Sequence, residues 1–189
     1  MTMRVIAAFT FVIAANTVAI GQSPVQKLEA VTDPDAYAIY AELVPQAWAN
    51  LSKERLLLQQ ETETMFRCRG SGSPVVAPEW QAVENNFRQE NIRPKLLQPL
   101  LPISGSYRLI PRAEIEADDA RLAVKYPGRY NRRPESMEYA AVSAVGYSAD
   151  KTKALVYMRF RSSGGFHSME RRDDKWVKVY SGVGCAWIV

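Results

Sequence analysis

Three ionisable side chains of the sequence could take part in acid–base chemistry. Glu61 and Glu63 are separated by one residue, so in a strand both carboxylates would face the same side. Paired carboxylates can cleave glycosides when they lie about 5 to 10 Å apart across a cleft. His167 is the only histidine of the chain, and its side-chain type titrates near neutral pH. Together these residues would be the catalytic candidates of a carboxylate-dependent hydrolase.

Other features of the sequence weigh against catalysis. His167 and Ser168 are neighbours in a strand-like segment, so they face opposite sides and cannot form a local base–nucleophile pair. Residues 146–150 lack the second glycine of a nucleophile elbow, and residues 69–74 lack the Lys-Ser/Thr of a phosphate-binding loop. A single histidine and two cysteines do not supply a typical zinc site. We therefore predict no metal or cofactor, and we lean towards a protein that is not an enzyme.

The arginine-rich strands suggest a different chemistry, the binding of anions. Arg159, Arg161 and Arg171 lie on two neighbouring predicted strands, and Tyr157 and Trp176 could add aromatic contacts. Guanidinium groups that share a face can bind phosphate, sulfate or carboxylate in a bidentate manner. These five residues are the candidate binding residues. The alternative is an exposed sheet face whose charges prevent aggregation through strand edges.

The elements that carry these residues are predicted to be consecutive hairpins. From Met137 onwards, short β-rich runs alternate with turn-forming segments at 148–152, 162–165 and 173–175. Residues 154–161 alternate between apolar side chains and side chains with polar ends, which predicts a half-buried antiparallel strand. The two aspartates at 173–174 predict a tight turn.

Helices are predicted in the first two thirds of the chain. Residues 34–48 begin with Pro34, follow a possible cap at Thr32 or Asp33, and have an apolar stripe at helical spacing. They contain Pro45, which we expect to kink or end the helix. Residues 78–91 and 113–126 have similar spacing, and residues 106–112 predict a short strand. Residues 54–64 could continue a helix or begin a strand, and we favour the strand. We therefore predict one α+β domain over residues 34–189, with N-terminal helices on a curved antiparallel sheet that ends in a β-meander. A helix over such a sheet can leave a pocket, for which the candidate lining residues are Trp48, Trp80, Tyr107, Tyr147, Tyr157 and Trp176.

The last third of the chain resembles uncharacterised secreted bacterial proteins. Their shared pattern is a Tyr-Pro-Gly loop, a Ser-x-Val-Gly strand, an Ala-Leu-Val-Tyr strand, a glycine turn and a Lys-Trp strand. It is matched here at residues 126–128, 143–146, 154–157, 164–165 and 175–176. Many such proteins carry cysteines in the glycine turn, where this chain has Ser162 and Ser163. The resemblance implies the fold of this region and brings no activity or thiol chemistry.

The N-terminus predicts export. Arg4 precedes an apolar run at 5–15, and small residues follow at Ala19 and Gly21, which is the order of a signal peptide cleaved after Gly21. The run is shorter than the roughly 20 residues that span a bilayer; an uncleaved amphipathic anchor is the alternative. Residues 1–21 are thus the predicted signal peptide and 22–33 a flexible tail, in a periplasmic or secreted protein that does not span the membrane. In an oxidising compartment, Cys68 and Cys185 form a predicted disulfide, with two free thiols as the alternative.

The composition limits the partners. The formal net charge is +4, or one less without Arg4, which is too little to imply nucleic acid. The expected partner is an unknown small molecule, an anionic component of the cell envelope, or a protein. The sequence therefore favours an exported, non-enzymatic protein that binds a ligand or partner, with a carboxylate-dependent hydrolase or an anion-binding protein as the alternatives.

Overall fold

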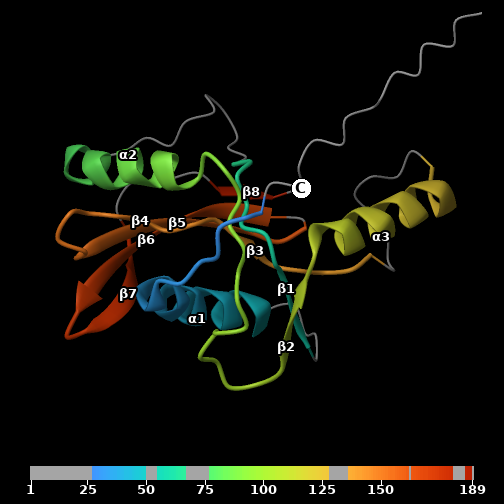
Figure 1. Cartoon of the computed structure of the whole chain (residues 1–189), viewed down its shortest axis with the longest axis horizontal. Helices are drawn as coiled ribbons and strands as arrows, with labels where there is room; N and C mark the ends of the chain where they lie inside the picture. Colours follow the sequence, from blue (N-terminus) through green and yellow to red (C-terminus); the bar gives the residue numbers. More distant parts are fainter. Residues whose placement is uncertain are drawn as a thin grey trace, which may run out of the picture.

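Three α-helices and a mostly antiparallel sheet form the described part of the chain, which confirms the predicted α+β class (Figure 1). This computed structural model describes residues 27–49, 55–66, 77–127, 136–161, 163–180 and 186–188. The helices are α1 (Pro34–Ala49), α2 (Gln81–Glu90, after the 3₁₀ turn Pro78–Trp80) and α3 (Arg112–Lys125). The strands are β1 (Leu56–Gln59), β2 (Tyr107–Ile110), β3 (Ala141–Val142), β4 (Gly146–Tyr147), β5 (Lys153–Arg159), β6 (Ser163–Arg172), β7 (Lys175–Val179) and β8 (Ala186–Ile188).

The C-terminal strands form the predicted meander. Strand β5 pairs antiparallel with β6, and β6 with β7; β3 and β4 follow one another along the other edge of β5. Strand β8 returns to pair with the beginning of β6. Strand β1 runs parallel to β2 in a two-stranded sheet, and an isolated parallel bridge from Leu58 to Ala140, the residue before β3, connects this pair to the larger sheet. This parallel section was not anticipated from the sequence.

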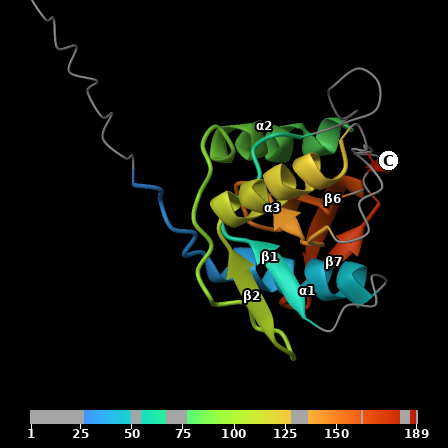
Figure 2. The ribbon, with the colours of Figure 1, turned by 90° about the vertical axis from the view of Figure 1, so that its right-hand side faces the viewer.

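Both faces of the sheet are covered, which corrects the prediction of a half-buried strand. Helix α1 lies on one face, and α2 and α3 lie on the other (Figures 1 and 2). Val156 faces the cluster that contains α1, whereas Leu155 and Tyr157 face the cluster that contains α2. All three side chains are completely buried. The alternating pattern of β5 was read as one buried and one exposed face, but α2 covers the second face.

Helix α1 begins as predicted and ends one residue after the predicted range. The Asp33 carboxylate accepts a hydrogen bond from the backbone N–H of Asp35 at 3.0 Å and so caps the helix. Pro45 does not end the helix, which continues to Ala49. The stripe that contains Ile39, Tyr40 and Val44 is fully buried against the sheet.

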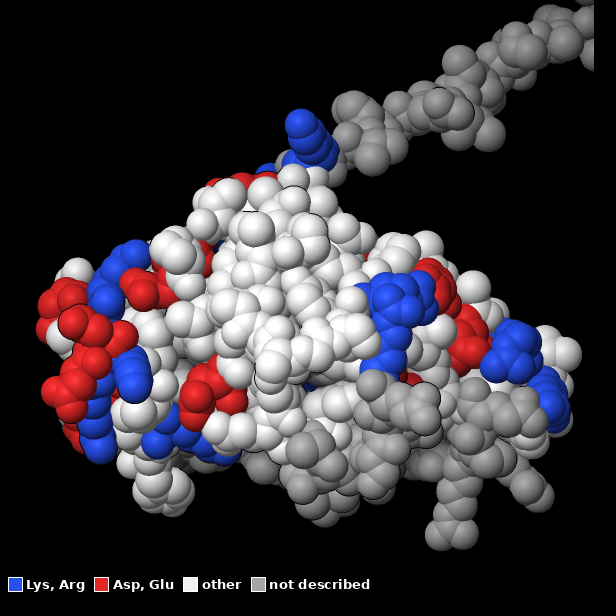
Figure 3. Space-filling view, turned by 90° about the horizontal axis from the view of Figure 1, so that it is seen from below, with Lys and Arg blue, Asp and Glu red and all other residues white. Residues whose placement is uncertain are grey.

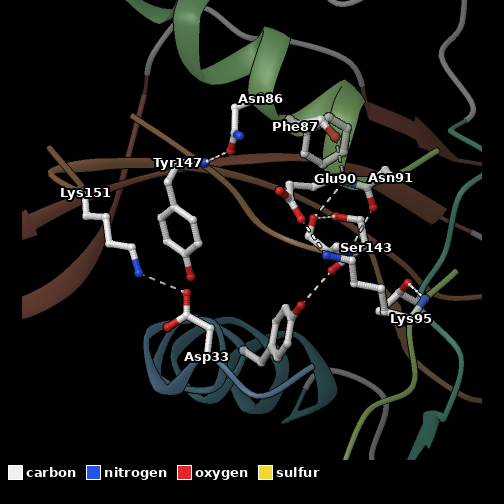
Figure 4. A network of polar contacts seen from close by, with 12 residues as sticks. Asp33, Asn86, Phe87, Glu90, Asn91, Lys95, Ser143, Tyr147 and Lys151 are labelled. Carbon is white, nitrogen blue, oxygen red and sulfur yellow. Dashed lines mark hydrogen bonds and ion pairs between the residues drawn. The ribbon is translucent and has the colours of Figure 1, made fainter. Parts of the chain in front are cut away.

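A one-residue bulge separates β3 from β4 where a single strand was expected. Val142 pairs with Met158 and Gly146 with Leu155, so one strand has an extra residue. Tyr157 donates its backbone N–H to the Ser143 hydroxyl at 2.8 Å. Asn91 accepts the N–H of Ala144 at 2.8 Å and donates to its carbonyl at 3.0 Å, as Figure 4 shows in part. The Tyr40 hydroxyl donates to the Ser143 carbonyl at 2.8 Å, so the bulge is buried with its polar groups paired.

The turn between β6 and β7 is the predicted tight turn. Asp173 and Asp174 have φ angles of 48° and 58°, in the left-handed region that aspartate tolerates better than most residues.

None of the helices in the described part of the chain has the length and apolar composition needed to cross a bilayer. The predicted signal peptide and both cysteines lie outside the described residues.

Candidate functional site

The two glutamates of the predicted hydrolase have structural partners instead of a shared cleft. Glu61 accepts a hydrogen bond at 2.8 Å from the backbone N–H of Arg112, the first residue of α3. The Glu63 side chain is buried and forms an ion pair with Arg159, and it also accepts the N–H groups of Thr64 at 3.0 Å and Met65 at 2.9 Å. Although burial opposes ionisation, the Arg159 charge and these donors hold the pKa of Glu63 below its usual value.

His167 lies apart from both glutamates. It pairs with Val156 in the sheet and therefore points to the face covered by α1, whereas Arg159 and its partner Glu63 lie on the other face. Burial, and to a smaller extent the nearby Lys178 charge, lowers the pKa of His167 to about 4. Its Nδ1 is buried and has no hydrogen-bond partner among the described residues. The structure thus places this imidazole as a neutral side chain within the fold, and it does not bring the three catalytic candidates together.

The candidate arginines do not form a shared patch. Arg161 pairs with Asp119 at 2.5 Å, while Arg171 pairs with Asp35 at 3.5 Å and Asp174 at 3.7 Å. Ala154 of β5 pairs with Met169 of β6, so even-numbered residues of β5 share a face with odd-numbered residues of β6. Arg159 and Arg171 both have odd numbers, and they therefore face opposite sides of the sheet. The expectation of a common anion-binding face is not met.

The two aromatic binding candidates belong to the core. Tyr157 is completely buried among Phe66, Phe87 and Phe166, with ring centroids 5.2 Å from Phe66 and 5.1 Å from Phe166. Trp176 is almost buried and donates its Nε1–H to Asp35 at 3.3 Å. Neither ring is presented to a ligand at the surface, which corrects their assignment as binding residues.

A polar cavity lies elsewhere, between the start of α1, the end of α2 and the turn after β4 (Figure 4). Its volume is about 430 Å³, which suits a small organic molecule. Its charged lining side chains are Glu29, Asp33, Glu90, Lys95 and Lys151, and its floor includes Val31, Ala36, Ala144, Val145 and Tyr147. The cavity is therefore a mixture of charged walls and an apolar floor. We call it the α1–α2 cavity.

One wall of the α1–α2 cavity combines a carboxylate, a phenol and an ammonium. The Lys151 Nζ lies 3.3 Å from Asp33 Oδ2 and 5.1 Å from the centre of the Tyr147 ring. The Tyr147 hydroxyl is buried and points towards Asp33 (Figure 4). Burial and the negative charges of Asp33 and Asp35 raise the pKa of Tyr147 far above its ordinary value. The ring is thus a neutral phenol at physiological pH.

The opposite wall carries a second ion pair. Lys95 Nζ lies 2.5 Å from Glu90 Oε2, at the end of α2. Glu29, Glu90 and Lys95 also border a second depression of about 910 Å³, which reaches the exposed Ile92. The α1–α2 cavity therefore opens beside a larger groove on the same side of α2.

Only one lining residue of the α1–α2 cavity was predicted from the sequence to line a pocket. Tyr147 was among the aromatic residues expected to line a pocket, whereas Asp33 was recognised only as a helix cap. Lys151, Glu90 and Lys95 gave no signal, because isolated charges in a turn or at a helix end are typical of any protein surface. The described residues contain no group of three His, Cys, Asp or Glu side chains arranged to hold a metal ion.

No family model matches the chain, and the searches of curated proteins and of solved structures found no significant match. The resemblance of the C-terminal third to secreted bacterial proteins therefore stays a prediction. The geometry of the α1–α2 cavity is the basis for any functional assignment.

Proposed function

We propose that the protein is an exported, non-enzymatic protein that binds a small polar ligand in the α1–α2 cavity. The observation that carries this proposal is the cavity itself, because it gathers five charged side chains outside the apolar core around a volume of about 430 Å³. Export is inferred from the order of charged, apolar and small residues in positions 1–21.

The arrangement of the cavity supports binding more than catalysis. Asp33 and Glu90 are each neutralised by a lysine, at 3.3 Å and 2.5 Å, so neither carboxylate is poised as a free general base. The cavity lining includes Ser148 but not His167, so a histidine-activated nucleophile is not assembled there. The rival hydrolase would need Glu61, Glu63 and His167 in one cleft, and His167 lies on the opposite face of the sheet from Glu63 and its partner Arg159.

Native mass spectrometry of the protein released from the envelope of its producing cells tests this proposal. We expect a chain that begins at Gln22 and carries a bound small molecule. Ala149 is exposed and lines the cavity, so Ala149→Trp should fill the cavity and remove the bound species. Ala120→Trp is the matched control, because Ala120 is exposed on α3 away from the cavity and should leave binding intact.

Two results would overturn the proposal. The first is that folded wild type and folded Ala120→Trp carry no bound species. The second is that Ala149→Trp and wild type carry the bound species to the same extent. A chain that retains residues 1–21 would contradict export by cleavage. The same spectrum reports the Cys68–Cys185 bond, because an oxidised pair lacks two hydrogens.

A further inference from the structure

The Lys151 ammonium occupies a site that is built to attract a cation. It lies over the face of the Tyr147 ring, 5.1 Å from the ring centre, and 3.3 Å from the Asp33 carboxylate. An aromatic face and a carboxylate both attract positive charge, the first through its quadrupole and the second through its net charge. The cation in this position is at present supplied by the chain itself (Figure 4).

The attracting groups are held firmly. Asp33 is fixed as the cap of α1 by its bond to the Asp35 N–H at 3.0 Å. The backbone N–H of Tyr147 donates to the Asn86 side chain at 2.7 Å, and its ring packs against Trp176 with centroids 5.9 Å apart. The phenol and the carboxylate therefore keep their positions whichever cation lies between them.

Lys151, in contrast, is loosely held. Its side chain is 52% exposed, and it stands in a turn with a φ of 53°, a conformation that lysine adopts rarely. An exposed ion pair of this kind contributes little to stability, so the ammonium can leave at small cost. When it leaves, the cavity keeps three carboxylates, those of Glu29, Asp33 and Glu90, against the one remaining amine of Lys95.

We propose that the ligand of the α1–α2 cavity carries a primary ammonium group, which displaces the Lys151 ammonium from Asp33 and the Tyr147 ring. This inference rests on the proposed function and names the chemical class of the ligand. A primary ammonium matches the group that it replaces, because it presents three N–H donors to the carboxylate and the buried phenol oxygen. Lys151 is then a tethered competitor that lowers the affinity for the ligand.

Titration with n-butylammonium, which copies the end of a lysine side chain, tests the inference. Binding is followed by NMR through the indole N–H of Trp176, whose ring neighbours Tyr147. We expect Lys151→Asn to bind n-butylammonium about fivefold to tenfold more tightly than wild type, because the competitor is gone. Asparagine tolerates the left-handed backbone of this turn, so the variant keeps the fold.

Three comparisons make the result specific. Asp33→Asn keeps the cap of α1 but removes its charge, and we expect it to weaken n-butylammonium binding about tenfold. Lys153→Gln is the matched control, since the Lys153 ammonium lies 5.1 Å from the Trp80 ring outside the cavity lining, and it should change nothing. The neutral n-butanol, which has the same chain length, should bind at least tenfold more weakly than n-butylammonium in Lys151→Asn.

Equal binding of the amine and the alcohol, or equal amine affinity in wild type and Lys151→Asn, would overturn the inference. If the species found by native mass spectrometry lacks an amine and n-butylammonium does not bind, the ligand class is wrong while the binding function stands. If no species is bound in the native protein, or if Ala149→Trp and wild type carry it equally, the binding function itself fails.

Discussion

At the scale of single residues, Arg159 organises the polar interior between β5 and α3. Its guanidinium pairs with Glu63, donates to the Tyr139 hydroxyl at 3.0 Å, and lies 5.3 Å from the Tyr139 ring centre. Glu63 is only 1% exposed, so its carboxylate has lost its contacts with water, and the ion pair with Arg159 compensates for that loss. The residue that looked most like an anion-binding group is therefore a structural cation.

The substitution Arg159→Met should destabilise the protein by about 3 kcal/mol, because it leaves the Glu63 charge buried without its partner. Urea unfolding measures this change. Arg172→Met removes an arginine whose side chain is 62% exposed and pairs with Glu170, so it should cost less than about 0.5 kcal/mol. Restoration of stability in Arg159→Met with Glu63→Gln would identify the stranded charge as the cause, and a loss as small as that of Arg172→Met would contradict it.

His167 should make the fold sensitive to acid. Its pKa is about 4 in the folded protein against 6.5 ordinarily, so the unfolded chain binds its proton first as the pH falls. The stabilisation is complete above pH 6.5 and is lost as the pH falls towards 4. By linkage, wild type should lose about 3 kcal/mol more than His167→Leu between pH 7 and pH 4.

Unfolding free energies measured across this pH range check the expectation for His167. Lys178→Gln serves as the comparison variant, since the Lys178 charge is the smaller of the two causes and most of the pH dependence should remain. Parallel curves for wild type and His167→Leu would show that the imidazole is as easily protonated in the folded protein as in the unfolded chain.

At the scale of elements, the contact between α2 and β4 depends on the absence of a side chain at Gly146. A Cβ at this position would overlap the backbone of Phe87 in α2, which cannot move independently of its helix. We expect Gly146→Ala to shift α2 and destabilise the protein by about 3 kcal/mol in urea unfolding. A loss below about 0.5 kcal/mol would mean that α2 adjusts freely on the sheet.

The stability of the bulge between β3 and β4 should depend on Asn91. Asn91→Leu removes the partner of both backbone groups of Ala144 in a buried position, and we expect a cost of about 2 to 4 kcal/mol. Asn85→Leu changes the same residue type on an exposed position of α2 and should cost less than about 0.5 kcal/mol. Equal costs, measured by thermal or urea unfolding, would show that the Asn91 contacts contribute nothing particular to the bulge.

Local patterns predicted the elements, whereas contacts distant in sequence decided their arrangement. The apolar stripes of α1 and α2 and the Asp173–Asp174 turn have local causes and were predictable. The position of β1 between β2 and β3 was not, because parallel pairing leaves no signal in adjacent residues. Leu155 and Tyr157 are buried by α2, and the alternation of residues along a strand cannot predict that a helix distant in sequence covers its second face. The α1–α2 cavity combines segments 29–36, 86–95 and 144–151, each with side chains that are ordinary by themselves.

At the scale of the whole molecule, the charged side chains of the described residues occur in local pairs and are not gathered in one patch. Figure 3 shows the face that carries α1, where the centre is largely uncharged and acidic and basic side chains occur together near the edges. Helix α1 has only two charged residues, Asp35 and Glu42, and residues 96–107 have none. A small net charge spread in this way gives little steering towards a polyanion.

Retention on a heparin column should therefore depend on net charge alone. Arg161→Gln with Arg171→Gln removes two candidate arginines that pair separately with Asp119 and Asp35, on different faces of the sheet. Arg88→Gln with Arg172→Gln removes two arginines that pair with Glu84 and Glu170 and changes the net charge equally. We expect both double variants to elute at the same, slightly lower salt concentration than wild type, because each loses two dispersed charges. A much earlier elution of the first variant alone would show that Arg161 and Arg171 act together on an anion, which their opposite orientation in the sheet argues against.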